Sequence, residues 1–380
     1  MLPPPSLSSV STRRSRSSSP RKPSESTYRA RTLFRARIYV DAKAPQEVDT
    51  RINSVLHYLP ADHATLKLLA AKLQSQSMEW AATQAGEAEW AESIHEALNG
   101  LKSSNLVIAR NRDWISDIKP TVHQPLIPQS SVPRKRLSEQ SRPGEPDSSR
   151  PGMNPESSSS FSSTQPAAAP TLCRDTALSV SSEQTLSMPF FLKDPRPDIS
   201  LGLSDGTLAT ALHSAGVANA DFLLNDLQDT SELISDPGVT PLSLRFPFLL
   251  VEAKSGATDG NLYQAQNQAA VGGASAVNIQ KAPFGAADGQ PLKTRGPQLA
   301  GSLTPMSLCF SVTTEGPVCE LWAHFWGETK SSYGMANIGI WRTTQEDSAF
   351  DLISKISSIL NWGSTAFQDD VVKSLMLWRF

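Results

Sequence analysis

Residues 246–254, Phe-Pro-Phe-Leu-Leu-Val-Glu-Ala-Lys, constrain the fold of this 380-residue chain more than any other stretch, because a run of large apolar residues ends in two charged ones. Side chains along a strand alternate between its two faces. The even-numbered residues from Phe248 to Lys254 are therefore expected on one face and the odd-numbered ones on the other. Both faces are apolar as far as Leu250, which predicts a strand buried on both sides near the centre of a sheet. Glu252 and Lys254 at its end are costly to bury unless an ion or a charged partner compensates them.

A second predicted strand, residues 197–203, opens with an aspartate, Asp198, and then alternates polar or small residues with apolar ones. Such alternation is typical of a half-buried strand. One carboxylate from each of two adjacent strands can bind the same divalent cation through oxygen. We therefore expect Asp198 to lie on the strand beside Glu252, with Lys254 at the edge of the same site.

Two alternatives to this interpretation follow from the residues themselves. Most Glu-x-Lys triplets are solvated surface pairs of little energetic consequence. Asp236 is also nearer to Glu252 in the sequence than Asp198 is, although the Pro237-Gly238 pair after it predicts a turn and not a strand.

Pro197-Asp198 followed by Glu252-Ala253-Lys254 resembles the signature of the PD-(D/E)xK nuclease superfamily. The likeness is greatest to the fungal PD-(D/E)xK nuclease-like domain proteins, and it extends over most of the chain from about Tyr28, except for one long insertion. Other stretches that resemble the fungal group are Tyr28-Arg29-Ala30-Arg31, Glu87-Ala88-Glu89-Trp90 with Ile94-His95, Arg196-Pro197-Asp198-Ile199 with Gly202, and Thr314-Glu315-Gly316-Pro317. The resemblance implies an α/β domain with a restriction-endonuclease-like core, in which helices flank a mixed central β-sheet.

The same resemblance implies metal-dependent hydrolysis of phosphodiester bonds, with DNA as the favoured substrate. Asp198 and Glu252 would bind Mg²⁺ or Mn²⁺, with the backbone carbonyl of Ala253 as a further oxygen ligand. Lys254 would orient or polarise the attacking water and offset negative charge that develops on the phosphate.

Two helices are expected to supply supporting residues. Glu87 falls inside the apolar stripe predicted for a helix over residues 78–101, and the superfamily often has a Glu there; a helix-end Glu that faces solvent is the alternative. A second helix, over residues 261–271, is predicted to end at Gly272-Gly273. It carries Gln264 and Gln268 on one face. The superfamily often has a Gln on this helix, and Gln268 is the better candidate, although an exposed Ala/Gln face is the alternative.

The remaining pattern divides the chain into four segments. Residues 1–27 form a Ser-, Pro- and Arg-rich basic tail that we expect to be disordered, and residues 28–127 form the N-terminal helical part of the core. Residues 128–188 are rich in Ser and Pro and have almost no aromatic residues, so we expect a disordered insertion. Residues 189–380 complete the nuclease-like core. Further helices are predicted over residues 61–73, 207–216, 221–234, 350–360 and 369–378, and strands near residue 106 and over 306–312, 318–326 and 337–342.

Composition excludes several classes of protein. The net charge of -2 excludes a uniformly basic nucleic-acid binder, although residues 13–37 hold nine Arg or Lys against one Glu. Three scattered cysteines favour a reducing compartment over a zinc site or a disulfide framework. No apolar run is long enough to cross a bilayer, and the N-terminus lacks a secretory signal, so an intracellular protein is expected. Residues 133–136, Pro-Arg-Lys-Arg, resemble a nuclear import signal and favour a nuclear location.

The leading hypothesis is therefore a metal-dependent nuclease, and the rival is a catalytically inactive module of the same fold that binds nucleic acid or protein. His324 has no visible triad partner and is interpreted as structural. The sequence does not indicate the oligomeric state.

Overall fold

The structure is a computed structural model that describes residues 24–58, 61–124, 190–288, 307–327 and 331–377. All of these residues belong to one compact unit. The expected insertion at 128–188, the import-like cluster at 133–136 and the tail up to residue 23 lie outside the described residues.

A seven-stranded mixed sheet forms the centre of this unit, in the order β1-β7-β6-β5-β4-β3-β2. Strands β1 with β7 and β4 with β5 pair in parallel, whereas the other neighbours pair antiparallel. The expectation of an α/β fold with a mixed sheet flanked by helices is confirmed. The strands are β1 (Ile38–Val40), β2 (Leu106–Arg110), β3 (Ile199–Ser204), β4 (Leu244–Lys254), β5 (Leu308–Glu315), β6 (Val318–Gly327) and β7 (Ser332–Arg342).

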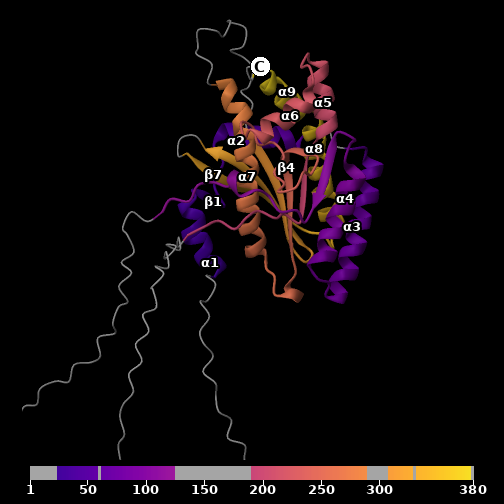
Figure 1. Cartoon of the computed structure of the whole chain (residues 1–380). Coiled ribbons are helices and arrows are strands. Elements are labelled where there is room, and N and C mark those ends of the chain that lie inside the picture. Colours follow the sequence, from indigo (N-terminus) through magenta and orange to yellow (C-terminus); the bar gives the residue numbers. More distant parts are fainter. Residues whose placement is uncertain (1–23, 59–60, 125–189, 289–306, 328–330, 378–380) are drawn as a thin grey trace, which may run out of the picture. The chain divides into compact units, whose positions relative to one another are not determined.

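Helices cover both faces of the sheet (Figure 1). Helix α7 (Leu262–Asp288) packs along β4, β5 and β6 on one face. On the opposite face, α4 (Glu87–Leu101) contacts β4, α8 (Glu346–Trp362) contacts β7, and α3 (His63–Thr83) packs on both of these helices. The smaller elements are α1 (Glu25–Thr27), η1 (Tyr28–Leu33), α2 (Gln46–Leu56), η2 (Ser116–Ile118), α5 (Asp205–Ser214), α6 (Ala220–Asp229), η3 (Gly256–Thr258), η6 (Gly363–Phe367) and α9 (Gln368–Met376).

Strand β4 is buried along its whole length, as its apolar sequence predicts. The predicted alternation holds from Leu250 to Lys254 but is wrong at Phe248. Leu250 lies under Gly272 of α7, whereas Phe248 packs against Trp362 on the opposite face. The reason is an irregularity in the pairing of β3 with β4, together with a left-handed backbone at Phe246 (φ 48°), which breaks the alternation before Leu249.

The prediction that Gly272-Gly273 ends a helix is wrong, because α7 continues through both glycines to Asp288. The glycines instead allow α7 to approach the sheet closely. A Cβ on Gly273 would lie 2.2 Å from Nδ1 of His324, and one on Gly272 would lie 3.1 Å from Leu250. His324 is itself buried and hydrogen-bonds to Ser311 (2.7 Å). Burial lowers the pKa of His324 to about 3, which agrees with its structural interpretation.

Other boundaries also differ from those predicted. The helix expected over residues 78–101 is interrupted at 84–86, because α3 ends at Thr83 and α4 begins at Glu87. The expected interruption between residues 73 and 78 is absent, because α3 runs without a break to Thr83 and ends at Gln84 in the left-handed conformation (φ 54°). Helix α1 falls inside the tail that we expected to be disordered. Ser24 accepts a hydrogen bond from the N–H of Thr27 and so starts the helix, and Asn267 of α7 donates two hydrogen bonds to Glu25.

Gly273→Ala tests the close approach of α7 to the sheet. The added methyl group meets a buried, hydrogen-bonded ring that cannot move aside, so we expect the free energy of unfolding to fall by about 1–3 kcal/mol. Urea denaturation followed by circular dichroism measures this change. The control is Gly206→Ala in α5, where no atom lies within 4 Å of the new methyl group. That variant should be as stable as the wild type or more stable by about 0.5–1 kcal/mol, and an equal loss in both variants would contradict the packing argument.

Candidate active site

Asp198 lies directly before β3, beside the end of β4. Ile199 pairs with Val251 and Ser200 with Leu250 in an antiparallel register, so Asp198 falls opposite Glu252. Its carboxylate oxygen Oδ2 accepts a hydrogen bond of 2.7 Å from the backbone N–H of Ala253. Asp198 thus lies beside Glu252 as expected, although it immediately precedes β3 and is not part of the strand. The two acidic residues come from segments 54 positions apart only because β3 and β4 pair in this register.

Lys254 and Glu87 meet at the same end of β4. The Lys254 ammonium donates to Oε2 of Glu87 (3.3 Å) and to the backbone carbonyl of Ala253 (2.7 Å). Lys254 is 9% exposed, and Glu87, the first residue of α4, is partly buried. Glu87 thus contacts Lys254 as part of this group, although its side chain at the start of α4 is 38% exposed. Gly260, in the loop after β4, packs directly against this group. A Cβ on Gly260 would lie 2.7 Å from Glu87 Oε1.

Glu252 is buried but unpaired. Its side chain is 3% exposed, and among the residues that the structure describes no donor forms a hydrogen bond or ion pair with it. Burial raises the pKa of Glu252 well above its usual value, and the neighbouring Asp198 carboxylate raises it further, while Lys254 opposes both effects. A carboxylate in this setting holds a proton or requires a cation.

Asp198 has a milder electrostatic environment. Burial raises its pKa, whereas the N–H of Ala253 and the charge of Lys254 lower it. Arg196, two residues before Asp198, also lowers the pKa of Asp198. The exposed guanidinium of Arg196 lies 3.5 Å from the carboxylate of Asp113. Both carboxyl groups therefore have raised pKa values, and burial is the main cause in each.

Gln268 makes no hydrogen bond to the group formed by Asp198, Glu252, Lys254 and Glu87. Its side chain is exposed and forms no hydrogen bond to any described residue. It stands one helical turn before Gly272, which borders Leu250 and Pro197, so it belongs to the α7 face that is turned towards Asp198. Gln264, the other candidate, is engaged in hydrogen bonds with Asn261 at the start of α7.

Asp236, the competitor of Asp198, belongs to a turn far from Glu252. Its carboxylate accepts hydrogen bonds from the backbone N–H groups of Gly238 (2.9 Å) and Leu242 (2.7 Å), as the Pro-Gly pair predicts. Its charged neighbours are Arg245 and Asp205, at the opposite end of β4. Arg245 precedes Glu252 by seven residues, or roughly 23 Å of strand.

Several features of this site are not evident from the sequence. The backbone N–H of Asn111 donates to the carbonyl of Asp198 (3.0 Å) and ties β2 to the site. The hydroxyl of Ser255 donates to the carbonyl of Ala85 (2.7 Å) and ties the end of β4 to the connection before α4. A cleft of about 540 Å³ opens beside this connection, between the Trp80–Trp90 pair and residues 255–257. Only long-range pairing brings these segments together, so no local pattern could reveal them.

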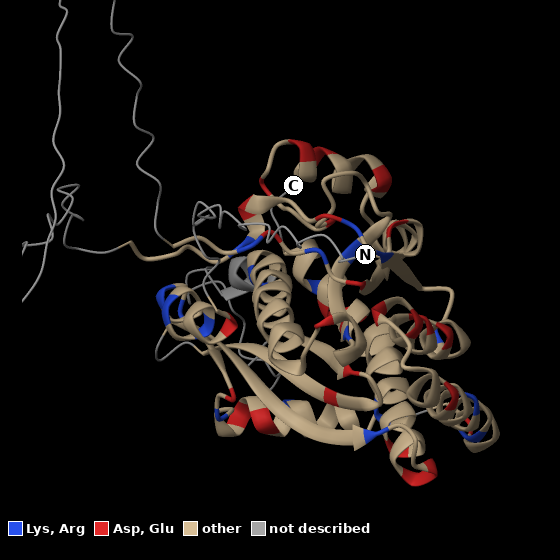
Figure 2. Ribbon diagram, turned by 90° about the horizontal axis from the view of Figure 1, so that it is seen from below, with Lys and Arg blue, Asp and Glu red and all other residues tan. Residues whose placement is uncertain are grey.

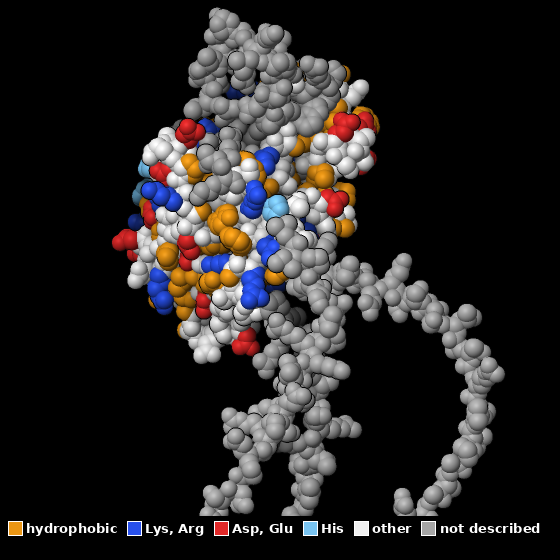
Figure 3. Space-filling view, turned by 90° about the vertical axis from the view of Figure 1, so that its left-hand side faces the viewer, with side chains coloured by type: hydrophobic (Ala, Val, Ile, Leu, Met, Phe, Trp, Pro, Cys, Tyr) orange, Lys and Arg blue, Asp and Glu red, His pale blue; other side chains and the backbone are white. Residues whose placement is uncertain are grey.

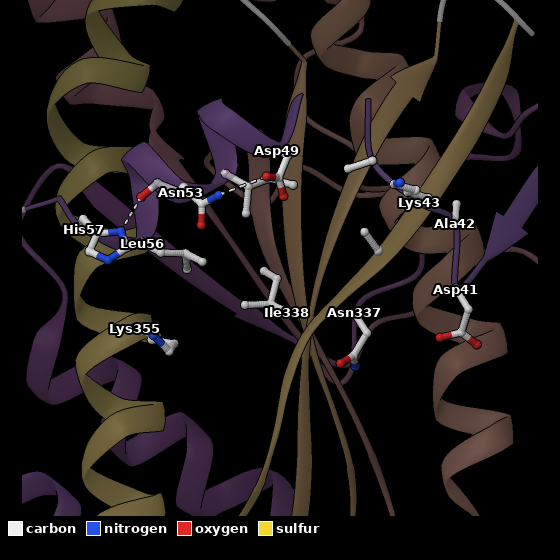
Figure 4. Close-up of a pocket in the computed structure, with 13 residues that line it drawn as sticks. Asp41, Ala42, Lys43, Asp49, Asn53, Leu56, His57, Asn337, Ile338 and Lys355 are labelled. Carbon is white, nitrogen blue, oxygen red and sulfur yellow. Dashed lines mark hydrogen bonds between the residues drawn. The ribbon is translucent and has the colours of Figure 1, made fainter. Parts of the chain in front are cut away.

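Other parts of the structure are weaker candidates. A cleft of about 540 Å³ lies between α2, α8 and β7 (Figure 4). Its charges are mixed, and Asn53 at its wall is hydrogen-bonded to Asp49 and His57. Over the described ribbon, acidic and basic residues are interspersed without one uniformly basic face (Figure 2). Within the described ranges no group of three or more His, Cys, Asp or Glu residues is arranged to hold a metal ion, and no helix there is long and apolar enough to cross a membrane.

The fold and this site define an α/β protein in which a buried glutamate, a partly buried aspartate and a lysine lie at the end of a central strand. The chain belongs to the family described as Domain of unknown function (DUF7924), whose model matches residues 161–373, more than half of the chain. No curated protein and no solved structure matches the chain.

The raised pKa of Glu252 makes a testable link between pH and stability. In the absence of metal, the folded protein keeps this proton over a pH range in which the unfolded chain, with a pKa near 4.5, has lost it. The stability that this proton contributes is therefore complete below the unfolded pKa and is lost as pH rises to the folded pKa. Glu252→Gln removes that loss. Its stability relative to the wild type should increase with pH by about 1.4 kcal/mol for each pH unit between the two pKa values.

Urea unfolding of both proteins with EDTA, at about pH 5 and about pH 8, measures this difference. Glu89→Gln, an exposed substitution on α4, is the matched control and should follow the wild type at both pH values. A constant difference between Glu252→Gln and the wild type would mean that Glu252 ionises normally.

Proposed function

We propose that the site at the end of β4 hydrolyses phosphodiester bonds of nucleic acid with the help of a divalent metal ion, and that DNA is its substrate. The observation that carries the proposal is the buried Glu252 carboxylate, which has no hydrogen-bond donor among the described residues and lies beside Asp198. A stable fold has little reason to keep such an acid in its core unless the acid binds something. The resemblance of these residues to PD-(D/E)xK nucleases supports the same reaction. A nuclear location, suggested by residues 133–136, would place the protein with that substrate.

The residues present fit Mg²⁺ or Mn²⁺ by their donor chemistry, since both ions prefer oxygen ligands. Asp198 uses only Oδ2 in its hydrogen bond to Ala253, so Oδ1 remains available. Glu252 would supply a second carboxylate. The Ala253 carbonyl, the further ligand expected, accepts a hydrogen bond from the Lys254 ammonium in this structure, so Lys254 would have to move before that oxygen could bind the ion. When bound, the ion would stabilise negative charge on the phosphate and lower the pKa of a bound water.

Lys254 has the position of a group that acts on the water and the phosphate. Glu87 and the Ala253 carbonyl hold its ammonium at the edge of the carboxylate pair. From there the ammonium can donate a hydrogen bond to an attacking water and offset charge on the phosphate. The contact with Glu87 restricts the position of the Lys254 ammonium. Gln268 would support the site from α7, where its exposed amide is free to reach a bound substrate.

The rival function, a catalytically inactive module that binds nucleic acid or protein, is favoured by a different observation. The ammonium of Lys254 already has two partners within the chain, and these partly compensate its burial without any ligand. A fold of this kind does not fix activity. The two functions differ in whether the carboxylate pair binds metal.

Substitution of the site residues separates the two functions. With Mg²⁺ or Mn²⁺, the wild type should cleave DNA, and Asp198→Ala, Glu252→Ala and Lys254→Ala should each lower the rate at least about 10²-fold. Glu87→Gln should lower it less, because Glu87 positions Lys254 and is not itself expected to bind the metal. Calorimetric titration with Mn²⁺ gives a readout that does not depend on cleavage. Asp198→Ala and Glu252→Ala should lose binding, while Lys254→Ala should keep it.

The control is Glu89→Gln, which removes an exposed carboxylate from the same helix as Glu87 and should leave both metal binding and cleavage unchanged. Circular dichroism checks that each variant folds. A wild type that binds no Mn²⁺ and cleaves neither DNA nor RNA would reject the enzyme in favour of the binding module.

A further inference from the structure

A second concave surface, distinct from the carboxylate site, combines arginines with aromatic rings. We call it the arginine–aromatic cradle. It has a volume of about 560 Å³, within the range of ligand sites. The side of the molecule on which α1, β1 and β7 lie in Figure 1 shows basic side chains beside hydrophobic ones (Figure 3). The cradle is lined chiefly by Arg31, Phe34, Arg35, Arg37, Tyr39 and Phe190, with no acidic residue among its lining.

The aromatic rings of the cradle are exposed to an unusual degree for large apolar side chains. Phe34 is 59% exposed and Tyr39 is 39% exposed. Their rings meet edge to face, with centroids 6.1 Å apart and planes at 88°. This arrangement orients both rings and leaves a face of Phe34 open to a planar ligand.

The three arginines divide into one structural residue and two free ones. Arg35 exchanges two hydrogen bonds of 3.0 Å with the backbone of His123, and its guanidinium lies 4.6 Å from the ring centre of Phe190. Arg31 and Arg37 are exposed, and neither side chain forms an ion pair or hydrogen bond to a residue that the structure describes. Arg37 also has a left-handed backbone (φ 55°), which is costly for a residue with a Cβ. The fold thus holds two uncompensated guanidiniums beside open rings, in a chain whose acidic residues outnumber its basic ones.

The cradle is connected to the carboxylate site through Arg29. The guanidinium of Arg29 donates to Asn267 and Gln266 (2.8 Å each) and lies 3.5 Å from the ring centre of Tyr263. These three residues belong to the first turns of α7, which begins eight positions after Lys254. η1 is therefore fixed to the helix that follows the site.

We propose that the cradle binds a single-stranded segment of nucleic acid, with a base stacked on Phe34 and phosphates held by Arg31 and Arg37. Open aromatic faces interleaved with free arginines are typical of single-strand binding, because every base offers a π-face and every linkage a negative charge. A duplex keeps its bases stacked inside and cannot use the ring of Phe34. The choice of nucleic acid rests on the proposed function, but the binding itself requires neither metal nor cleavage.

Fluorescence anisotropy with the full-length protein and a labelled oligothymidylate of about 15 nucleotides, in EDTA, tests the cradle. Phe34→Ala should weaken binding about tenfold, and Phe34→Trp should restore it. The double substitution of Arg31 and Arg37 by Ala should weaken binding and reduce the slope of log affinity against log salt by about 1.4 in magnitude. Matched controls are Phe222→Ala on α6, which is 71% exposed, and Arg112→Ala in an exposed loop; both should bind as the wild type does.

Three results would overturn the proposal. They are unchanged affinity in the cradle variants, equal affinity for a duplex of the same length, or equally effective competition by polyglutamate of matched charge, which would indicate an acidic protein partner instead. Nuclease activity, measured separately with Mg²⁺ or Mn²⁺, distinguishes this inference from the proposed function, since oligonucleotide binding in EDTA requires neither metal nor cleavage. Binding that depends on the cradle in a protein without nuclease activity would reject the enzyme and retain the cradle.

Discussion

Burial of β4 on both faces is the constraint on which the rest of the structure depends. A strand buried from end to end needs a helical layer on each side and a partner strand along each edge. Helix α7 covers one face and comes close enough only because glycines 272 and 273 lack side chains. Helix α4 covers the end of the other face through Trp90 and Ala91, which pack on Ala253. The same packing that stabilises the strand therefore surrounds its charged end.

The sequence predicts the elements of the sheet better than the helices around it. Strands β3 to β7 are apolar enough to be recognised, and the order of Asp198 and Glu252 suggested their pairing. The continuation of α7 past its two glycines was not predictable, because the reason for those glycines is His324 on a different element. The edge strand β1 was missed because three residues give little periodic signal. Helix α2 was missed as well, although Val48, Ile52 and Val55 recur at helical spacing on its buried face.

The candidate site shows the same division between local and long-range information. Glu252 and Lys254 follow from one strand, and Glu87 follows from the position of one face of its helix. The contacts that decide the chemistry are different, because they join distant segments: Ala253 to Asp198, Lys254 to Glu87, and Asn111 to the Asp198 backbone. Gln268 was chosen by its depth on α7, and its exposed side chain makes it a residue that would act only on a bound substrate.

The site at the end of β4 and the arginine–aromatic cradle differ in charge, and this difference affects how each could bind nucleic acid. The site at the end of β4 holds three carboxylates, those of Asp198, Glu252 and Glu87, against the ammonium of Lys254. Even with a proton on Glu252 the group remains negative, so it repels a phosphate until a divalent cation arrives. The proposed cleavage at this site would thus depend on metal binding. The cradle has the opposite balance, arginines without an acid in its lining, and attracts phosphate without help. Under the two proposals, a metal-free protein would hold nucleic acid through η1 and β1, whereas binding at the end of β4 would require the cation.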